Sequence, residues 1–296
     1  MPLVYIILVN YNGYEDTIEC VKSLKSVSYS NYKIVIVDNA STNNSLTYLK
    51  SSLKECIIIE SKENLGFAGG NNLGIDYALN NGSEYVMLLN NDTLVESNFL
   101  ELMLRKFKEN TDIGLVGCKI MYYPKKDVIW YGGGYIDWFK FIAVHHGAKQ
   151  VDNGQCDKEK EIDFMTGCCM LIKSEIFEKT GNLSDDYFMY FEDADFCMKV
   201  KDTGYKIWYN PKAVIYHKVG LSSGGEESLF SIKWGTRNRL IFMKKYKGKV
   251  SKLNYLLSYM FFYTTRIIKC VQYVSKKDND RAKAIIEGIK MSCKRV

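Results

Sequence analysis

The sequence predicts an α/β protein with a mostly parallel central sheet and flanking helices. Short apolar runs typical of buried strands alternate with segments whose apolar residues recur at helical spacing. Such alternation is typical of parallel strands joined by right-handed crossovers. Three of the runs end in polar side chains, at Asn10, Asp38 and Asp92. Because open α/β sheets bind ligands outside the carboxyl ends of their strands, we expect these residues to line one crevice.

The first half of the chain supplies the strands and helices in turn. The expected strands are the short apolar runs over residues 3–9, 33–38, 56–59 and 85–89. The expected helices are one containing Ile18, Val21, Leu24 and Val27, one over about 44–53, and one that opens at Ser97-Asn98. Only Gly13 follows the first strand, and no P-loop is present, which argues against dinucleotide dehydrogenases and P-loop enzymes.

Two polar segments of this half are candidates for ligand binding. The strand over 85–89 ends in Asn90-Asn91-Asp92, and a carboxylate at such a tip suits Mg²⁺, which shares its coordination with substrate phosphates. The alternative is an Asx-rich turn. The glycine-rich segment 64–72 precedes a helix, and backbone N–H groups at a helix start can hold phosphate. Its alternative is a flexible loop with a helix N-cap.

The second half becomes regular again after a less regular stretch over 122–160. We expect a strand over 163–172, an aromatic loop over 183–191, a helix over 192–204, and strands over 206–209 and 213–217. The helix begins with Glu192, Asp193 and Asp195, and mutual repulsion should raise the proton affinity of one of them, as a general base requires. The alternative is that they only complement the helix dipole.

The histidines receive different interpretations. His217 lies at a strand tip, as Asp92 does, and as a neutral imidazole it would complete a metal site. The adjacent His145 and His146 lack nearby Cys or carboxylates at ligand spacing. We therefore interpret this pair as polar surface or hydrogen-bonding structure rather than as a metal site.

The composition predicts a protein with a sizeable core, a cytoplasmic location and reduced cysteines. The 296 residues are 47% hydrophobic and 25% charged, which predicts a sizeable core. The start of the chain lacks a basic region before its apolar run, so we expect no signal peptide and a cytoplasmic location. The nine cysteines include no Cys-x-x-Cys pair and are expected to be reduced thiols.

The C-terminal segment 241–296 is strongly basic. It holds 14 Lys and Arg against 3 Asp and Glu, a net charge of +11, whereas the remainder carries −5 of the total +6. Within it, the uncharged stretch 253–265 is too short for a span, which needs about 20 residues, but resembles a helix in a membrane interface. The alternatives are a helix packed on the core or on a second subunit, and nucleic-acid binding is a weaker reading, without a recognition motif.

These motifs together resemble the family 2 glycosyltransferases, and within them the bacterial rhamnosyltransferase and galactofuranosyltransferase branch. The resemblance covers about 1–240. The matching residues are Asn10-Tyr11-Asn12, Val37-Asp38-Asn39 with Ser41, the loop 64–71, Leu88-Leu89-Asn90-Asn91-Asp92, Thr166-Gly167, Glu192-Asp193-Ala194-Asp195, Gly204-Tyr205, Pro211, His217 and Arg237-Asn238-Arg239. Where the family has Asp-x-Asp, this chain has Asn90-Asn91-Asp92, so that only Asp92 is a carboxylate.

The resemblance implies an A-type glycosyltransferase fold with a Rossmann-like sheet and a role for each matched residue. The catalytic domain would cover 1–240, with a nucleotide-sugar half over 1–120 and an acceptor half over 121–240, and 241–296 would form a helical extension. Asp193 would be the catalytic base, and Asp92 and His217 would hold Mn²⁺ or Mg²⁺. The donor would contact Asn10, Asn12, Asp38, Asn64, Gly66, Phe67, Asn71, Asn91 and Arg237. The acceptor side would include Thr166, Gly167, Glu192 and Asp195.

The implied activity is inverting transfer of a sugar from dTDP-rhamnose or a UDP-hexose. The acceptor would be a hydroxyl of a glycan or of a polyprenyl-diphosphate-linked saccharide, at the inner face of the plasma membrane, in the synthesis of a cell-surface polysaccharide. We expect no nucleic-acid partner, and a homodimer is an alternative use of the tail. The competing function is an inactive module that binds a nucleotide sugar or a polysaccharide.

Overall fold

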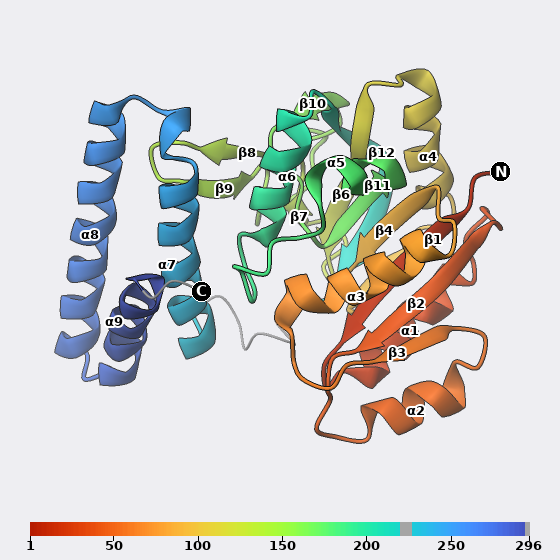
Figure 1. Ribbon diagram of the computed structural model, residues 1–296, viewed down its shortest axis with the longest axis horizontal. Helices are drawn as coiled ribbons and strands as arrows, with labels where there is room; N and C mark the ends of the chain where they lie inside the picture. Colours follow the sequence, from red (N-terminus) through yellow and green to blue (C-terminus); the bar gives the residue numbers. More distant parts are fainter. Residues whose placement is uncertain (220–226, 294–296) are drawn as a thin grey trace. The chain divides into compact units, whose positions relative to one another are not determined.

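A ten-stranded mixed sheet organises the first of two structural units in the part of the chain that the computed structural model describes, residues 1–219 and 227–293. The first unit comprises Met1–Tyr135, His145–Phe188 and Glu192–Val219. The second comprises Ile136–Val144, Met189–Phe191 and the described residues of Gly220–Val296. Figure 1 shows the sheet of the first unit with helices packed along it.

The main path of the sheet runs in the order β10-β12-β6-β11-β4-β1-β2-β3. β1 pairs in parallel with β2 and β4, β2 with β3, and β6 with β12. β4 and β6 both run antiparallel to β11 and therefore parallel to each other. These parallel strands are β1 (Val4–Asn10), β2 (Tyr32–Asp38), β3 (Ile57–Glu60), β4 (Tyr85–Leu89), β6 (Ile113–Tyr122) and β12 (Lys206–His217). The predicted mostly parallel sheet is confirmed.

Antiparallel strands complete the sheet. They are β5 (Thr93–Val95), β7 (Ile129–Tyr131), β10 (Lys160–Ile162) and β11 (Cys169–Lys173). β11 starts where β4 ends, because Cys169 is the partner of Leu89. The residues that precede β11 therefore lie at the same edge of the sheet as the carboxyl ends of β1, β2 and β4.

Helices in the first unit cover the sheet with apolar faces. They are α1 (Tyr14–Leu24), α2 (Ser45–Ser52), α3 (Gly66–Asn80), α4 (Phe99–Glu109), α5 (Ser174–Thr180) and α6 (Glu192–Asp202). In α4 the residues Phe99, Met103 and Phe107 lie one turn apart and are buried, which is the pattern of a helix that faces a core. β1, whose residues are almost all apolar, is buried along its length, as expected of a strand in the middle of a parallel sheet.

The second unit is mainly helical in its described residues. It contains α7 (Leu229–Lys245), a short 3₁₀ helix η1 (Lys247–Lys249), α8 (Lys252–Ser275) and α9 (Asn279–Cys293). The turn of a two-stranded sheet, β8 (Gly134–Asp137) and β9 (Ile142–His145), also belongs to it. The hydroxyls of Ser228 and Ser251 accept hydrogen bonds from the backbone N–H groups of Ser231 and Asn254 and so cap α7 and α8.

The strands of the second half differ in detail from their expected ranges. The strand expected over 163–172 begins only at Cys169, because Thr166 and Gly167 form the turn that meets α6. The two strands expected over 206–209 and 213–217 are one strand, β12, with an irregularity between Asn210 and Val214. The stretch 122–160 contains β7, β8, β9 and the start of β10, which are too short for a clear sequence period.

Candidate active site

The tips of β1 and β2 are joined by a buried hydrogen-bond network. Asn10 is the neighbour of Asp38 in the sheet, and its Nδ2 donates to Asp38 Oδ1 at 2.8 Å. The Ser41 hydroxyl donates to the same Asp38 oxygen at 2.6 Å. Thr17 on α1 donates to Asn10 Oδ1 at 2.9 Å and accepts from Asn91 Nδ2 at 2.8 Å. The network thus connects the carboxyl ends of β1 and β2 to the segment that follows β4.

The loops that follow these tips are fastened to one another. Asn12 Oδ1 accepts from the backbone N–H of Thr42 at 2.8 Å. Asn39 Nδ2 donates to Asn64 Oδ1 at 3.1 Å and to the Gly66 carbonyl at 2.9 Å. This arrangement ties the loop after β2 to the glycine-rich segment at the start of α3, so that both present backbone groups at the same edge.

Gly66 occupies a position that only glycine fits. Its φ is +70°, and a Cβ there would lie 2.0 Å from the carbonyl oxygen of Phe188. That carbonyl accepts a hydrogen bond from the N–H of Phe67 at 2.8 Å. Asn71, one turn into α3, donates from Nδ2 to the Phe67 carbonyl at 2.9 Å. The start of α3 is therefore held against the loop that precedes α6.

We expect Gly66→Ala to destabilise the protein and to weaken donor binding. The left-handed backbone costs a side chain about 1–2 kcal/mol, and the contact with Phe188 must be relieved by moving the loop. Gly82→Ala is the matched control, because Gly82 has a φ of +75° but nothing within 4 Å of its Cβ position. Urea unfolding and calorimetric titration with nucleotide sugar measure both effects, and equal losses of stability in the two variants would contradict the assigned contact.

Asp92 and His217 lie close together at the edge of the sheet where the parallel strands have their carboxyl ends. His217, the last residue of β12, pairs in the sheet with Thr93 and thereby reaches the residue next to it. Its Nε2 lies 3.0 Å from Asp92 Oδ1 and 3.3 Å from Asn90 Nδ2. The ring packs edge-on against Trp130, with centroids 4.5 Å apart. Both Asp92 and His217 are 5% exposed, so an aqueous shell does not satisfy their polar atoms.

The Asp92–His217 pair fits a divalent cation that shares its coordination with substrate. Asp92 Oδ1 is buried and has no hydrogen-bond partner within the described residues. Its contact with His217 is close but lacks hydrogen-bond geometry, as expected of two ligand atoms arranged for a third group. No cluster of three or more His, Cys, Asp or Glu that suits a metal occurs in the described ranges. Mg²⁺ and similar ions commonly take one or two protein ligands and complete their shell with phosphate oxygens and water.

Asp193 lies in the first turn of α6 beside the turn before β11. The Gly167 N–H donates to Asp193 Oδ2 at 3.1 Å, and the Ala194 N–H donates to Oδ1 at 2.8 Å. A Cβ on Gly167 would lie 3.0 Å from the Phe67 ring, so Gly167 separates this ring from Asp193. Burial raises the pKa of Asp193, and the two backbone donors offset part of the shift. The side chain remains partly exposed.

The neighbouring carboxyl groups are less accessible. Glu192 is buried, and burial together with the charge of Asp193 raises its pKa well above the ordinary value. The charge of Asp193 opposes the ionisation of Glu192, so Asp193 is the first of the two groups to lose its proton. Asp195 is fully buried and accepts a hydrogen bond from the Tyr187 hydroxyl at 3.4 Å. Thr166 is buried, and its hydroxyl oxygen accepts a hydrogen bond from the backbone N–H of Cys168 at 3.4 Å.

The first unit brings most of the expected site residues to one edge. The N–H of Asn90 donates to the Cys168 carbonyl at 2.9 Å. The residue before Cys168 is Gly167, whose N–H donates to Asp193, so the tip of β4 is connected to Asp193 through this turn. Arg237 belongs to α7 in the second unit, where it is 5% exposed, donates to Asn238 Oδ1 at 2.6 Å and lies over the Trp234 ring.

Sequence reasoning left four residues of this edge without a role. Asn39 and Ser41 were part of a matched motif, and the structure shows them holding the loop after β2. Thr17 and Trp130 carried no signal, because a Thr in a helix and a Trp in an irregular stretch are common in any protein. They become visible only through their contacts with Asn10 and His217.

Comparison with known proteins agrees with this architecture. The family model described as glycosyl transferase family 2 matches residues 5–181. The low-salt glycan biosynthesis hexosyltransferase Agl10 of Haloferax volcanii is 27% identical over 237 residues, which are 80% of this chain and 74% of that protein. The dTDP-rhamnosyl transferase RfbF of Shigella flexneri is 21% identical over 226 residues, 73% of this chain and 69% of that protein.

A solved structure shares the fold. The mannosyltransferase PcManGT of Pyrobaculum calidifontis, solved in complex with GDP-Man and Mn²⁺, has a TM-score of 0.60 at 13% identity and covers 98% of this chain and 87% of its own. Together with the mostly parallel sheet, this likeness confirms the predicted A-type glycosyltransferase fold. The match of the family model over more than half of the chain shows that the protein belongs to glycosyl transferase family 2.

Proposed function

We propose that the protein transfers a sugar from a nucleotide diphosphate-sugar to a hydroxyl group with inversion of the anomeric centre. The observation that carries this proposal is Asp193, a carboxylate with a raised pKa that two backbone N–H groups hold at the sheet edge. The same edge presents the Asp92–His217 pair and the network around Asn10 and Asp38.

The proposed reaction needs one carboxylate. Asp193 takes the proton of the acceptor hydroxyl while that oxygen bonds to the anomeric carbon of the donor. The bond between this carbon and the diphosphate oxygen breaks on the opposite side, and the nucleoside diphosphate leaves with the electron pair. Because attack is opposite the leaving group, the configuration inverts and no covalent intermediate with the protein forms. A raised pKa suits the task, since a stronger base accepts the proton more readily.

Asp92 and His217 would hold Mn²⁺ or Mg²⁺ in this scheme. A bound divalent cation would neutralise negative charge on the leaving diphosphate. The loop from Asn64 to Phe67, the tips Asn10, Asn12 and Asp38, and Asn71 and Asn91 shape the donor side of the edge. Asp38 is 3% exposed and already accepts hydrogen bonds from Asn10 and Ser41. We therefore assign it mainly to positioning the loop that meets the nucleotide.

The donor that we propose is dTDP-rhamnose or a UDP-hexose, supported by the activities named for the relatives in Shigella flexneri and Haloferax volcanii. Thermal-shift screening against UDP-, dTDP- and GDP-sugars with Mn²⁺ identifies the donor. Release of the nucleoside diphosphate in the presence of an acceptor then tests transfer. Binding of a nucleotide sugar without any release of diphosphate would replace the enzyme proposal with an inactive binding module.

The surface of α8 supports a membrane-bound acceptor. Its outward face carries apolar side chains three or four positions apart, and each of them is exposed within its unit: Leu253, Leu256, Leu257, Met260, Ile267, Ile268, Val271 and Val274. Only Ser258 and Phe262 of this helix are buried, so the stripe does not pack on the core of its unit. No helix within the described ranges has both the length and the apolar character needed to cross a bilayer.

We propose that this face lies in an anionic membrane interface, at the inner face of the plasma membrane, where the acceptor would be a polyprenyl-diphosphate-linked saccharide. Lysines flank the stripe at Lys252, Lys276 and Lys277, and each cation near an anionic leaflet adds about 1 kcal/mol of attraction. Burial of the apolar side chains in the interface adds the larger part of the binding free energy.

The protein should therefore sediment with vesicles that contain phosphatidylglycerol at low salt, and high salt should release part of it. The double substitution Ile267→Ser with Val271→Ser should abolish sedimentation, because it removes apolar area from the centre of the face. Ile286→Ser is the matched control, since Ile286 is an exposed apolar residue of α9. If the wild type ignores vesicles and the double variant turns a dimer into a monomer, the face is a subunit contact instead.

A further inference from the structure

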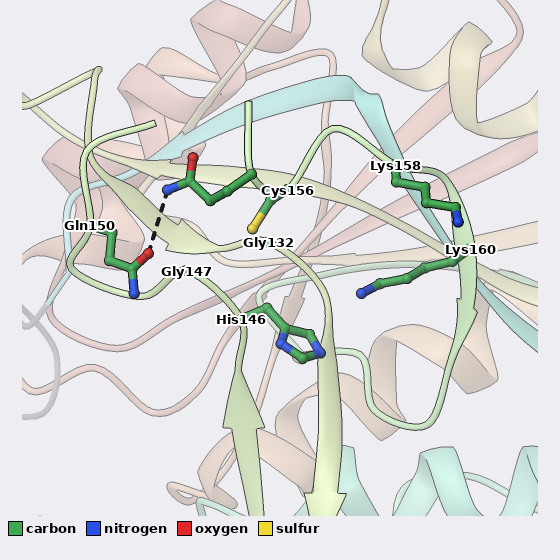
Figure 2. A pocket seen from close by; sticks show the side chains of 8 residues that line it. Gly132, His146, Gly147, Gln150, Cys156, Lys158 and Lys160 are labelled. Carbon is green, nitrogen blue, oxygen red and sulfur yellow. Dashed lines mark hydrogen bonds between the residues drawn. The ribbon is translucent and has the colours of Figure 1, made fainter. Parts of the chain in front are cut away.

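A polar pocket outside the proposed donor site lies in the first unit between the end of β7 and the segment that enters β10. It encloses about 170 Å³ and is lined mainly by polar groups, among them His146, Gln150, Gln155, Lys158 and Lys160. In Figure 2 the Lys160 side chain extends across the pocket toward the side formed by His146 and Cys156. Nothing in the proposed transfer step uses this pocket.

The acidic residues around the pocket already have partners. Lys119 forms ion pairs with Asp152, at 2.6 Å, and with Asp157. Glu159 forms ion pairs with Lys106 at 2.7 Å and with Lys212 at 3.6 Å. Asp157 and Glu159 are thus engaged by lysines outside the pocket and are not part of its lining, whereas Lys158 and Lys160 are.

The two lysines of the pocket, Lys158 and Lys160, form no ion pair with a carboxylate of the described residues, 1–219 and 227–293. The nearby His146 is half-buried, and burial together with the charge of Lys160 lowers its pKa. At neutral pH the pocket thus offers two ammonium groups beside a neutral imidazole.

The remaining lining suits a small hydroxylated molecule. Gln155 Nε2 donates to the Val151 carbonyl at 2.8 Å and to Gln150 Oε1 at 3.5 Å, and its Oε1 accepts from the Asn153 N–H at 2.7 Å. Gln155 therefore holds Gln150 in place, and the Gln150 Nε2 group is left to donate to a sugar hydroxyl. Gly132 forms the floor, where a Cβ would lie 2.4 Å from the Cys156 sulfur, so the backbone approaches closely. A volume of about 170 Å³ has room for one sugar ring with an acidic substituent.

The pocket is connected to the proposed metal pair through β7. The Gly132 N–H donates to the His146 carbonyl at 3.0 Å. Two residues before Gly132, the Trp130 ring contacts both His217 and His145. A saccharide chain held in the pocket would therefore be anchored beside the strand that supports His217, on the acceptor half of the unit.

We propose that this pocket binds an anionic sugar residue of the acceptor glycan, a sugar phosphate or a uronic acid, with Lys158 and Lys160 contacting the acidic group and Gln150 a hydroxyl. The proposal rests on the proposed transferase function only for the identity of the molecule as an acceptor. The binding itself stands on the pocket and its charges.

Nuclear magnetic resonance of the histidine rings tests this binding directly. The chain has only three histidines, His145, His146 and His217, so each ring signal can be assigned by substitution. At constant pH, glucose 6-phosphate or glucuronate should shift the His146 signals saturably, and glucose should shift them far less. The two acids distinguish phosphate from carboxylate as the preferred group. The double variant Lys158→Gln with Lys160→Gln should raise the dissociation constant at least tenfold, while Lys125→Gln, a surface substitution outside the pocket lining, should leave it unchanged.

The outcomes separate this inference from the proposed function. No saturable shift at His146 with either acid, or an equal shift with glucose, overturns the pocket assignment. Active transfer to acceptors with an unchanged KM in the double variant overturns the acceptor role. Saturable binding at His146 in a protein that never releases nucleoside diphosphate keeps the pocket and rejects the transferase. In an active enzyme we expect the double variant to raise the KM for a charged acceptor about tenfold and to leave the KM for the donor unchanged.

Discussion

Asp193→Asn is expected to lower the rate of sugar transfer by about 10²-fold or more, the usual scale for the loss of a general base. The amide keeps the size of the side chain and can still accept one backbone hydrogen bond, but it cannot take a proton from the acceptor hydroxyl. Donor binding should stay near normal, because the contacts of Asp193 are to Gly167 and Ala194 rather than to the Asp92–His217 pair. Single-turnover transfer and calorimetric donor binding measure the two effects separately.

Glu192→Gln is the matched control for this substitution. Burial and the adjacent charge of Asp193 raise the pKa of Glu192 well above its ordinary value, so Gln resembles the protonated side chain that this environment favours. Transfer within a few-fold of wild type is expected. A loss in Glu192→Gln as large as that in Asp193→Asn would move the base to Glu192, and wild-type transfer in Asp193→Asn would remove Asp193 from the mechanism.

The expected pH dependence of the transfer rate follows from the raised pKa values of Asp193 and Glu192. A base works in its deprotonated form, so transfer should rise with pH through the pKa of Asp193, which is raised above the ordinary range of Asp. The charge of Asp193 is one cause of the raised pKa of Glu192, so Asp193 loses its proton first and Glu192 is still neutral at that point. Glu192→Gln therefore replaces one neutral group by another, and the acidic limb should stay near its wild-type position. A large shift of this limb in Glu192→Gln would show that Glu192 is charged in the range where Asp193 ionises.

Asp92→Ala and His217→Ala are each expected to weaken cation-dependent donor binding by about tenfold or more, the scale on which loss of a supporting metal contact is felt. Their side chains converge to 3.0 Å, and both are buried at the sheet edge. Removing one of two protein ligands leaves a cation held mainly by the diphosphate. Calorimetric titration of Mn²⁺ and nucleotide sugar together measures this loss, and the cation should improve donor binding less in either variant than in the wild type.

His146→Gln is the matched control for His217→Ala, because His146 is a half-buried histidine that lines the separate pocket. It should leave cation-dependent donor binding unchanged. Thermal unfolding of each variant separates loss of a ligand from loss of fold, since His217 also packs on Trp130. Full activity of the wild type in EDTA would remove the cation from the scheme and assign the neutralisation of the leaving diphosphate to Lys or Arg side chains.

Local patterns in the sequence are sufficient for the order of the elements in the first half. The apolar runs of β1, β2 and β4 and the helical spacing in α1 and α4 are properties of neighbouring residues, so the strands and their polar tips could be read directly. Motif order then indicated the family. The short strands β7, β9 and β10 were not predicted. Three or four residues show no measurable period, and they form strands only because they pair with neighbouring strands.

By itself, the sequence determined that Asn10 and Asp38 end buried strands and that Asp92 follows another, and it predicted a candidate base at an acidic helix start. Only the tertiary structure decided which of these groups meet. β11 runs antiparallel and so delivers Gly167 to Asp193, and the pairing of β12 with β5 places His217 beside Asp92, 125 residues earlier in the chain. It also decided that Lys158 and Lys160 form no ion pair within residues 1–219 and 227–293, because Lys119 and Lys106 bind the neighbouring carboxylates of Asp157 and Glu159. Such contacts depend on strand register and on packing between distant segments, which no local spacing encodes.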